Sequence, residues 1–298
     1  MKPDSADSAW VRAMPLVFVL IWSTGFIVAK YGLPYAPPLG FLAWRYVFSM
    51  ACFAVWIFLS GARWPSDAGQ WWHLAISGVL MHAGYLGGVW FAVEHGMGSG
   101  LAALIVGLQP VLTAFWVSHM EGGQVRRSQW LGLMLGLLGL VLVIWRKLMA
   151  GIEVSGLTLS ATVFALLAIT AGTLYQKRYL RPTDVRTANF IQLSAALVLT
   201  LPLTFLETEP IVWNGHFIGA MAWAVLGLTL GGSSLLYVLI QRGAATTVTS
   251  LFYLVPPTTA MMAWVLFDEL ITATTVLGTA MTALGVALVV RQPRLSQA

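Results

Sequence analysis

The segment LQPVLTAF at Leu108–Phe115 recurs later in the chain as LVPPTTAM at Leu254–Met261, an offset of 146 residues. The same offset aligns WLGLMLGLLGLVLV at Trp130–Val143 with VLGTAMTALGVALV at Val276–Val289. Prolines and glycines therefore coincide in one ungapped register across two separate stretches. The pattern indicates that the chain arose by duplication and has two similar halves.

The composition around these segments is that of a membrane protein. Of the 298 residues, 58% are hydrophobic and 9% are charged, whereas a soluble domain carries roughly 25% charge. The apolar residues form repeated runs of about 20, long enough to cross a bilayer. The net charge of +5 is explained by Lys and Arg in loops held on the cytoplasmic side of the membrane, so we expect no nucleic-acid partner. The expected partners are the lipid bilayer and a small-molecule substrate.

Breaks at Gly, Pro and charge clusters predict an all-α polytopic membrane protein with ten transmembrane helices. The expected spans are Ala13–Ala29, Leu39–Leu59, Trp71–Val93, Gly98–His119, Trp130–Trp145, Gly156–Tyr175, Thr187–Leu206, His216–Ile240, Ala244–Phe267 and Thr272–Val290. The first repeat then covers residues 13–145 and the second covers residues 156–290. Because five spans is an odd number, the second five-helix repeat must be inverted relative to the first. In transporters, such repeats place the substrate site at their interface near mid-membrane; the alternative is a duplicated scaffold that moves nothing.

The Lys and Arg residues predict the orientation of the spans. With the amino terminus in the cytoplasm, three of the 16 basic residues lie outside (Lys30, Arg146 and Lys147), and Arg45 lies within the second span. The other basic residues lie inside, as the positive-inside rule requires. We therefore predict a multi-pass protein of the bacterial inner membrane with both termini cytoplasmic.

Polar and aromatic side chains near span centres are the expected substrate-binding residues, because polar groups in hydrocarbon must face a packed interior or a watery cavity. In the first half these are Trp22, Ser23, His82, Tyr85 and Gln109. His82 and Tyr85 share a helix face. For Trp22 and His82 the alternatives are an ordinary packing residue and a histidine tied to a nearby carbonyl.

In the second half the expected binding residues are Ser233, Tyr237 and Tyr253. Hydroxyl stripes of this kind line cavities, but they also serve as interhelical contacts. Pro110 removes a backbone hydrogen bond and is expected to bend the fourth span, and Pro256 and Pro257 are its counterparts. We expect these prolines to act in gating or, alternatively, in packing alone.

Other features limit the possible mechanisms. None of the 11 Asp and Glu residues falls near a span centre, so proton coupling through a buried acid is disfavoured and a uniport is expected, with His82 the remaining proton carrier. Arg45 stands near the start of its span and is expected to snorkel outward, the alternative being a contact with a substrate carboxylate. Gly84 and Gly88, like Gly132 and Gly136, are spaced for helix packing, the alternative being contact between two chains of a weak homodimer.

The sequence resembles the drug/metabolite transporter superfamily in its EamA-type branch. The residues that carry the resemblance are IWSTGFIVAK at Ile21–Lys30, the segment Ala102–Phe115 around Pro110, the acidic Glu121 and Glu269, and the glycine-patterned fifth and tenth spans. The resemblance covers nearly the whole chain, and it is strongest to amino-acid exporters of the YddG type. It implies an exporter of amino acids and related small metabolites working by alternating access.

Three functions are compatible with these features. Besides amino-acid export, an exporter of lipophilic cations and drugs would suit the aromatic content through cation–π contacts, although a deep acid is missing. An integral-membrane enzyme would need clustered acids and histidines. The sequence offers neither such a cluster nor a phosphate loop or HExxH motif, and its single cysteine, Cys52, excludes a cysteine-based metal site. We expect neither enzymatic activity nor a cofactor.

Overall fold

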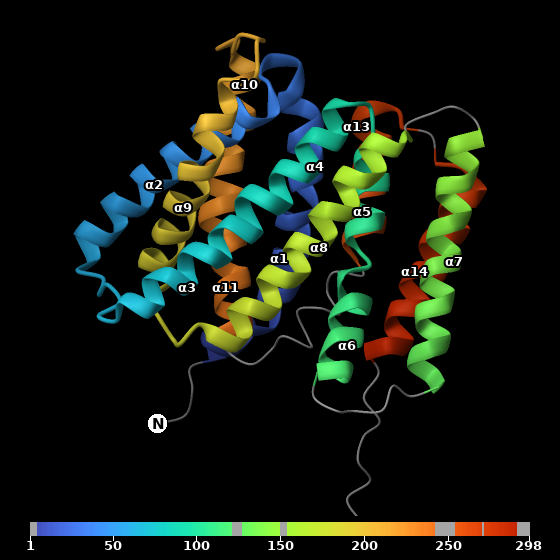
Figure 1. Cartoon of the computed structure of the whole chain (residues 1–298), viewed down its shortest axis with the longest axis horizontal. Coiled ribbons are helices and arrows are strands. Elements are labelled where there is room, and N and C mark those ends of the chain that lie inside the picture. The colour runs from blue at the N-terminus through green and yellow to red at the C-terminus, as the bar shows by residue number, and fades with distance from the viewer. Residues whose placement is uncertain (1–4, 121–126, 150–153, 242–253, 270, 291–298) are drawn as a thin grey trace, which may run out of the picture.

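A computed structural model describes residues 5–120, 127–149, 154–241, 254–269 and 271–290 (Figure 1). Helices make up 84% of the structure, and these residues contain no strand, so the predicted all-α class is confirmed. Six helices in the described part are long and apolar enough to span a membrane, and three shorter apolar helices accompany them. The predicted count of ten spans stays a prediction.

The elements of the first half follow one another with short connections. They are α1 (Ser5–Gly32), the 3-10 turn η1 (Leu33–Tyr35), α2 (Pro38–Ser60), α3 (Ala68–Gly78), η2 (Val79–Gly84), α4 (Tyr85–Glu94), α5 (Ser99–Val106), α6 (Gln109–Met120) and α7 (Arg127–Met149). Local sequence sets several boundaries. Helix α2 ends at Gly61, whose φ of 61° suits glycine, and α3 begins where the Asp67 side chain accepts from the Gly69 amide.

The second half repeats this order. Its elements are α8 (Gly156–Tyr179), α9 (Val185–Thr204), α10 (Gly215–Ala222), η3 (Trp223–Ser233), α11 (Ser234–Gln241), α13 (Val255–Phe267) and α14 (Ala273–Val290). A capping box between Ser155 and Thr158 starts α8. The amino terminus of α2 is capped from this half: both carboxylate oxygens of Glu207 accept from the amides of Leu39 and Gly40 at 2.7 Å.

One long span in each half contains a π-helical segment. The span Ala68–Glu94 is α-helical at both ends and π-helical over η2, and the span Gly215–Leu239 is π-helical over η3. Moving η2 by the repeat offset of 146 places it at 225–230, within η3. The two halves therefore share this irregularity at equivalent positions, and such bulges occur frequently at functional sites.

The expected break in the fourth span is present. Helix α5 ends at Val106 and α6 begins at Gln109, with Pro110 in its first turn, where a proline needs no intrahelical partner. Helix α13 likewise begins next to Pro256. The two breaks meet, since a Cβ on Gly107 would lie 2.7 Å from the Pro256 ring.

Helices α7 and α14 lie side by side (Figure 1) and pack through their glycines. A Cβ on Gly139 would lie 2.5 Å from the Gly278 carbonyl oxygen, and one on Gly285 would lie 2.4 Å from that of Gly132. As the residue number rises in one helix it falls in the other, so the two helices run antiparallel. Gly278 is the repeat counterpart of Gly132, and Gly285 is that of Gly139. Exchanging the two halves therefore converts one contact into the other, which is the contact pattern of a pseudo-two-fold axis.

The described core is organised around α1 and has two main clusters. One joins α1 to α4, α5 and α8, and the other joins α1 to α2, α9, α10 and η3. Gly88 lets α4 approach α8, because a Cβ there would lie 2.7 Å from the Ala161 carbonyl oxygen. The predicted packing role of Gly84 and Gly88 is confirmed, since both face α8.

Candidate functional site

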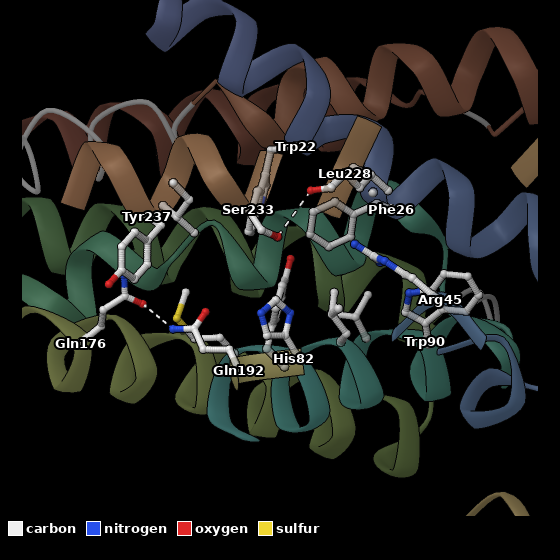
Figure 2. A pocket seen from close by; sticks show the side chains of 16 residues that line it. Trp22, Phe26, Arg45, His82, Trp90, Gln176, Gln192, Leu228, Ser233 and Tyr237 are labelled. Carbon is white, nitrogen blue, oxygen red and sulfur yellow. Dashed lines mark hydrogen bonds between the residues drawn. The ribbon is translucent and has the colours of Figure 1, made fainter. Parts of the chain in front are cut away.

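A cavity lies between the two halves of the chain. Five elements of the two halves meet around it, together with single residues of α2, α8 and α9 (Figure 2). The lining residues are Trp22, Gly25 and Phe26 of α1, Arg45 of α2, Met81 and His82 of η2, Tyr85, Leu86, Val89 and Trp90 of α4, Gln176 of α8, Gln192 of α9, Leu228 and Ser233 of η3, and Leu236 and Tyr237 of α11. Both π-helical segments therefore contribute to the wall.

Five of the residues singled out in the sequence meet in this cavity: Trp22, His82, Tyr85, Ser233 and Tyr237. The rings of Trp22 and Tyr85 are nearly parallel, with centroids 6.2 Å apart and an interplanar angle of 3°. Burial holds His82 and Tyr85 in place, because 6% and 4% of their surfaces are exposed. The lining thus combines an aromatic wall with polar side chains, as small-molecule sites commonly do.

Other expected site residues lie elsewhere. The Ser23 hydroxyl is buried and donates to the Val19 carbonyl oxygen at 2.7 Å, and Gln109 donates to the Thr173 hydroxyl oxygen at 3.0 Å. Neither lines the cavity, because each side chain is taken up by a neighbouring helical turn or helix. Pro110 and Pro256 form the helix breaks and do not line the cavity either, nor does Pro257. Tyr253 and Glu121 lie outside the described residues.

The prediction that Arg45 snorkels to the membrane surface is wrong. Its side chain points inward, 4% of the residue is exposed, and its Nε donates to the Thr229 hydroxyl oxygen at 3.0 Å. The position of Arg45 along the span sets only its depth in the membrane, whereas the face of α2 on which it lies sets the direction of its side chain. Arg45 lies on the same buried face as Leu42 and Ser49, and intramembrane charges almost always face the bundle interior.

The structure adds an amide cluster that the sequence analysis missed. Ser77 of α3 donates to Oε1 of Gln176 at 3.2 Å, and Nε2 of Gln192 donates to the Ser77 hydroxyl oxygen at 3.2 Å. Nε2 of Gln192 also lies 3.5 Å from Oε1 of Gln176. A glutamine within an apolar span is itself a signal of a polar interior, and Gln192 offered that signal.

The polar groups of the cavity are arranged along its length. In Figure 2, Arg45 and Trp90 lie at one end, Gln176 and Tyr237 lie at the other, and His82 lies between them. The Tyr46 hydroxyl donates to the His82 carbonyl oxygen at 2.9 Å and ties η2 to α2. Within the described residues, Arg45 is the charged side chain of the lining, and no Asp or Glu lines it.

A family model described as the EamA-like transporter family matches residues 10–145 and again residues 156–291. The chain belongs to this family. The match accounts for the two similar halves, and it makes this EamA-like protein a multi-pass membrane transporter.

Relatives of this EamA-like transporter carry related descriptions. An uncharacterised inner membrane transporter of Escherichia coli K12, YedA, is 25% identical over 80% of this chain and 76% of its own length. An uncharacterised transporter of Archaeoglobus fulgidus is 24% identical over 92% and 96% of the two chains. A probable amino-acid metabolite efflux pump of Salmonella typhimurium is 24% identical over 63% and 60%.

A solved crystal structure shares the fold of this EamA-like transporter. It is 18% identical in sequence, covers 92% of this chain and 94% of its own, and superposes with a TM-score of 0.67. The likeness concerns the fold alone.

Proposed function

We propose that this chain exports amino acids and related small metabolites across the inner membrane. The observation that carries the proposal is the cavity between the two halves, with its aromatic wall at Trp22 and Tyr85 and its polar groups at Arg45 and Gln192. The description of relatives as amino-acid metabolite efflux pumps supports the substrate class.

The mechanism we propose is alternating access by two inverted five-helix repeats with both termini in the cytoplasm. The antiparallel glycine contacts of α7 and α14 support inversion, as does the hydrogen bond from Thr282 to the Gly136 carbonyl oxygen at 3.4 Å. Thr282 is the repeat counterpart of Gly136, so a residue here meets its own equivalent. A cavity at the repeat interface is where such carriers bind their substrates.

Export of lipophilic cations is the second function that the aromatic content suits. The lining disfavours it, because its charged side chain is the cationic Arg45 and no described carboxylate is present to neutralise a bound cation. An exchange assay separates the two functions. The purified chain is reconstituted into liposomes and preloaded with unlabelled amino acids or with tetraphenylphosphonium.

We expect labelled amino-acid metabolites to enter the preloaded liposomes faster than they enter vesicles without protein. Tetraphenylphosphonium should enter both kinds of vesicle at the same rate. Exchange of the cation alone would support the alternative. The absence of exchange for every compound tested would refute the transport proposal.

A further inference from the structure

The guanidinium of Arg45 is a buried charge with no acidic partner. Its residue is 4% exposed, and no ion pair among the described residues includes it. The neighbouring titratable groups are the phenols of Tyr46 and Tyr85 and the imidazole of His82, and none of them is an acid that pairs with the guanidinium. Because a buried charge is costly unless an opposite charge compensates it, this arrangement favours an anion in the cavity.

The way Arg45 is held leaves its outer edge for a ligand. Thr229 occupies Nε at 3.0 Å, and within the described chain no side chain or carbonyl accepts from the two terminal nitrogens. Those nitrogens form a planar fork that matches the two oxygens of a carboxylate. Thr229 is itself fixed, because its hydroxyl donates to the Ala224 carbonyl oxygen at 2.9 Å.

The rest of the lining sets what the carboxylate can be attached to. Trp22 and Tyr85 provide the aromatic wall. Trp90 lies beside Arg45, and Gln176 and Gln192 provide neutral amides toward the other end (Figure 2). The lining has no described Asp or Glu to pair with a substrate ammonium. A zwitterion would therefore bury its cationic group without an anion, whereas a monoanion would leave no charge unpaired.

We propose that the cavity selects small monoanionic carboxylates with an aromatic or apolar body, with Arg45 binding the carboxylate and Thr229 positioning Arg45. This inference rests on the proposed export function and narrows its substrate class. It also specifies the driving force. Each substrate carries one net negative charge, so an inside-negative membrane potential drives its export, and 100 mV corresponds to a ratio of about 50-fold at equilibrium.

Three compounds that differ by single groups test the selection in liposomes containing the full purified chain. Phenyllactate has a carboxylate and a hydroxyl, phenylalanine has a carboxylate and an ammonium, and phenethylamine has an ammonium alone. We expect exchange of phenyllactate to exceed that of phenylalanine about tenfold, and phenethylamine to enter at the rate of protein-free vesicles. A valinomycin potential, positive inside the vesicles, should concentrate phenyllactate and leave phenylalanine at equilibrium.

Two variants test the role of Arg45. We expect Arg45→Gln to raise the half-saturating concentration of phenyllactate about tenfold or more, because a charge-assisted contact is lost. Arg45→Lys should give an intermediate value, since it keeps the charge and loses the fork. Arg63→Gln is the matched control, because Arg63 is exposed in the loop before α3, and its half-saturating concentration should equal that of the parent.

The outcomes separate this inference from the export function. Exchange of phenylalanine without phenyllactate, or an unchanged half-saturating concentration in Arg45→Gln, would overturn the selection of monoanions while leaving export in place. The absence of exchange for amino acids and carboxylates alike would overturn both. The comparison of compounds uses the parent chain, so it remains decisive even where Arg45→Gln does not fold.

Discussion

Lys30 Nζ lies 2.7 Å from Glu269 Oε1, an ion pair between residues 239 positions apart. Lys30 is in the last turn of α1 and Glu269 follows α13. The Ser99 amide and hydroxyl, at the start of α5, donate to the same oxygen at 3.2 and 3.0 Å. The Glu269 carboxylate therefore links the ends of α1, α5 and α13, which come from both halves of the chain.

This contact predicts an acid-sensitive stability. Burial raises the pKa of the Glu269 carboxyl, but Lys30 and Ser99 outweigh it and hold the pKa below the ordinary 4.5. The carboxylate therefore stabilises the fold above about pH 4.5, and the contribution is lost as pH falls through the lowered value. Glu269→Gln should lower the free energy of unfolding at pH 7 by about 1–2 kcal/mol, with the difference from the parent shrinking toward pH 3.

Thermal unfolding in detergent at several pH values measures this effect. Glu209→Gln is the control, because Glu209 is exposed and should behave like the parent. A difference between parent and Glu269→Gln that stays constant from pH 7 to pH 3 would contradict the assignment.

The contact between Arg45 and Thr229 predicts a positioning effect. Thr229→Val removes the acceptor of Arg45 Nε, so the half-saturating concentration for exchange should rise about tenfold or more, the value of one hydrogen bond to a charged group. Thr229→Ser keeps the hydroxyl and should restore the parent value. Equal behaviour of the Val and Ser variants would show that the threonine serves packing alone.

The close approach of α7 and α14 predicts an intolerant glycine. A methyl group at Gly139 would meet the Gly278 carbonyl oxygen at 2.5 Å, so Gly139→Ala should cost about 1–3 kcal/mol of stability. Gly87 of α4 has nothing within 4 Å of the same position. Gly87→Ala should therefore be neutral or slightly stabilising, and equal melting temperatures for the two variants would refute the contact.

The orientation is tested by cysteine labelling in intact cells, with Cys52→Ser as background. An impermeant maleimide should label Thr208→Cys, in the loop between α9 and α10, and leave Thr183→Cys, between α8 and α9, unlabelled. The reverse pattern would place both termini outside.

Proton coupling is tested by a pH gradient at zero membrane potential. Since no described carboxylate lines the cavity, we expect the gradient to leave substrate at its equilibrium distribution in both the parent and His82→Gln. Accumulation in the parent that disappears in His82→Gln would show that the histidine carries a proton.

Much of the fold could be predicted from the sequence because apolar length and charge determine which segments cross the bilayer. Helix faces were harder to predict. Gln109 lies at mid-span, as expected, but Thr173 of α8 takes its amide, and Arg45 faces inward because of the packing of α2. The neighbours of a side chain depend on how helices pack, which the hydrophobic pattern of one span does not contain.

The π-helical segments change the direction in which the later side chains of each long span point. A π-helical turn corresponds to one residue inserted into an α-helix, and each inserted residue rotates everything beyond it by about 100° relative to a regular helix. A helical wheel drawn through Ala68–Glu94 therefore assigns Tyr85 and Trp90 to the wrong side when it is anchored at α3. Deleting one residue within Val79–Gly84 would cancel the insertion and give a regular helix, and Tyr85 and Trp90 would still face the cavity.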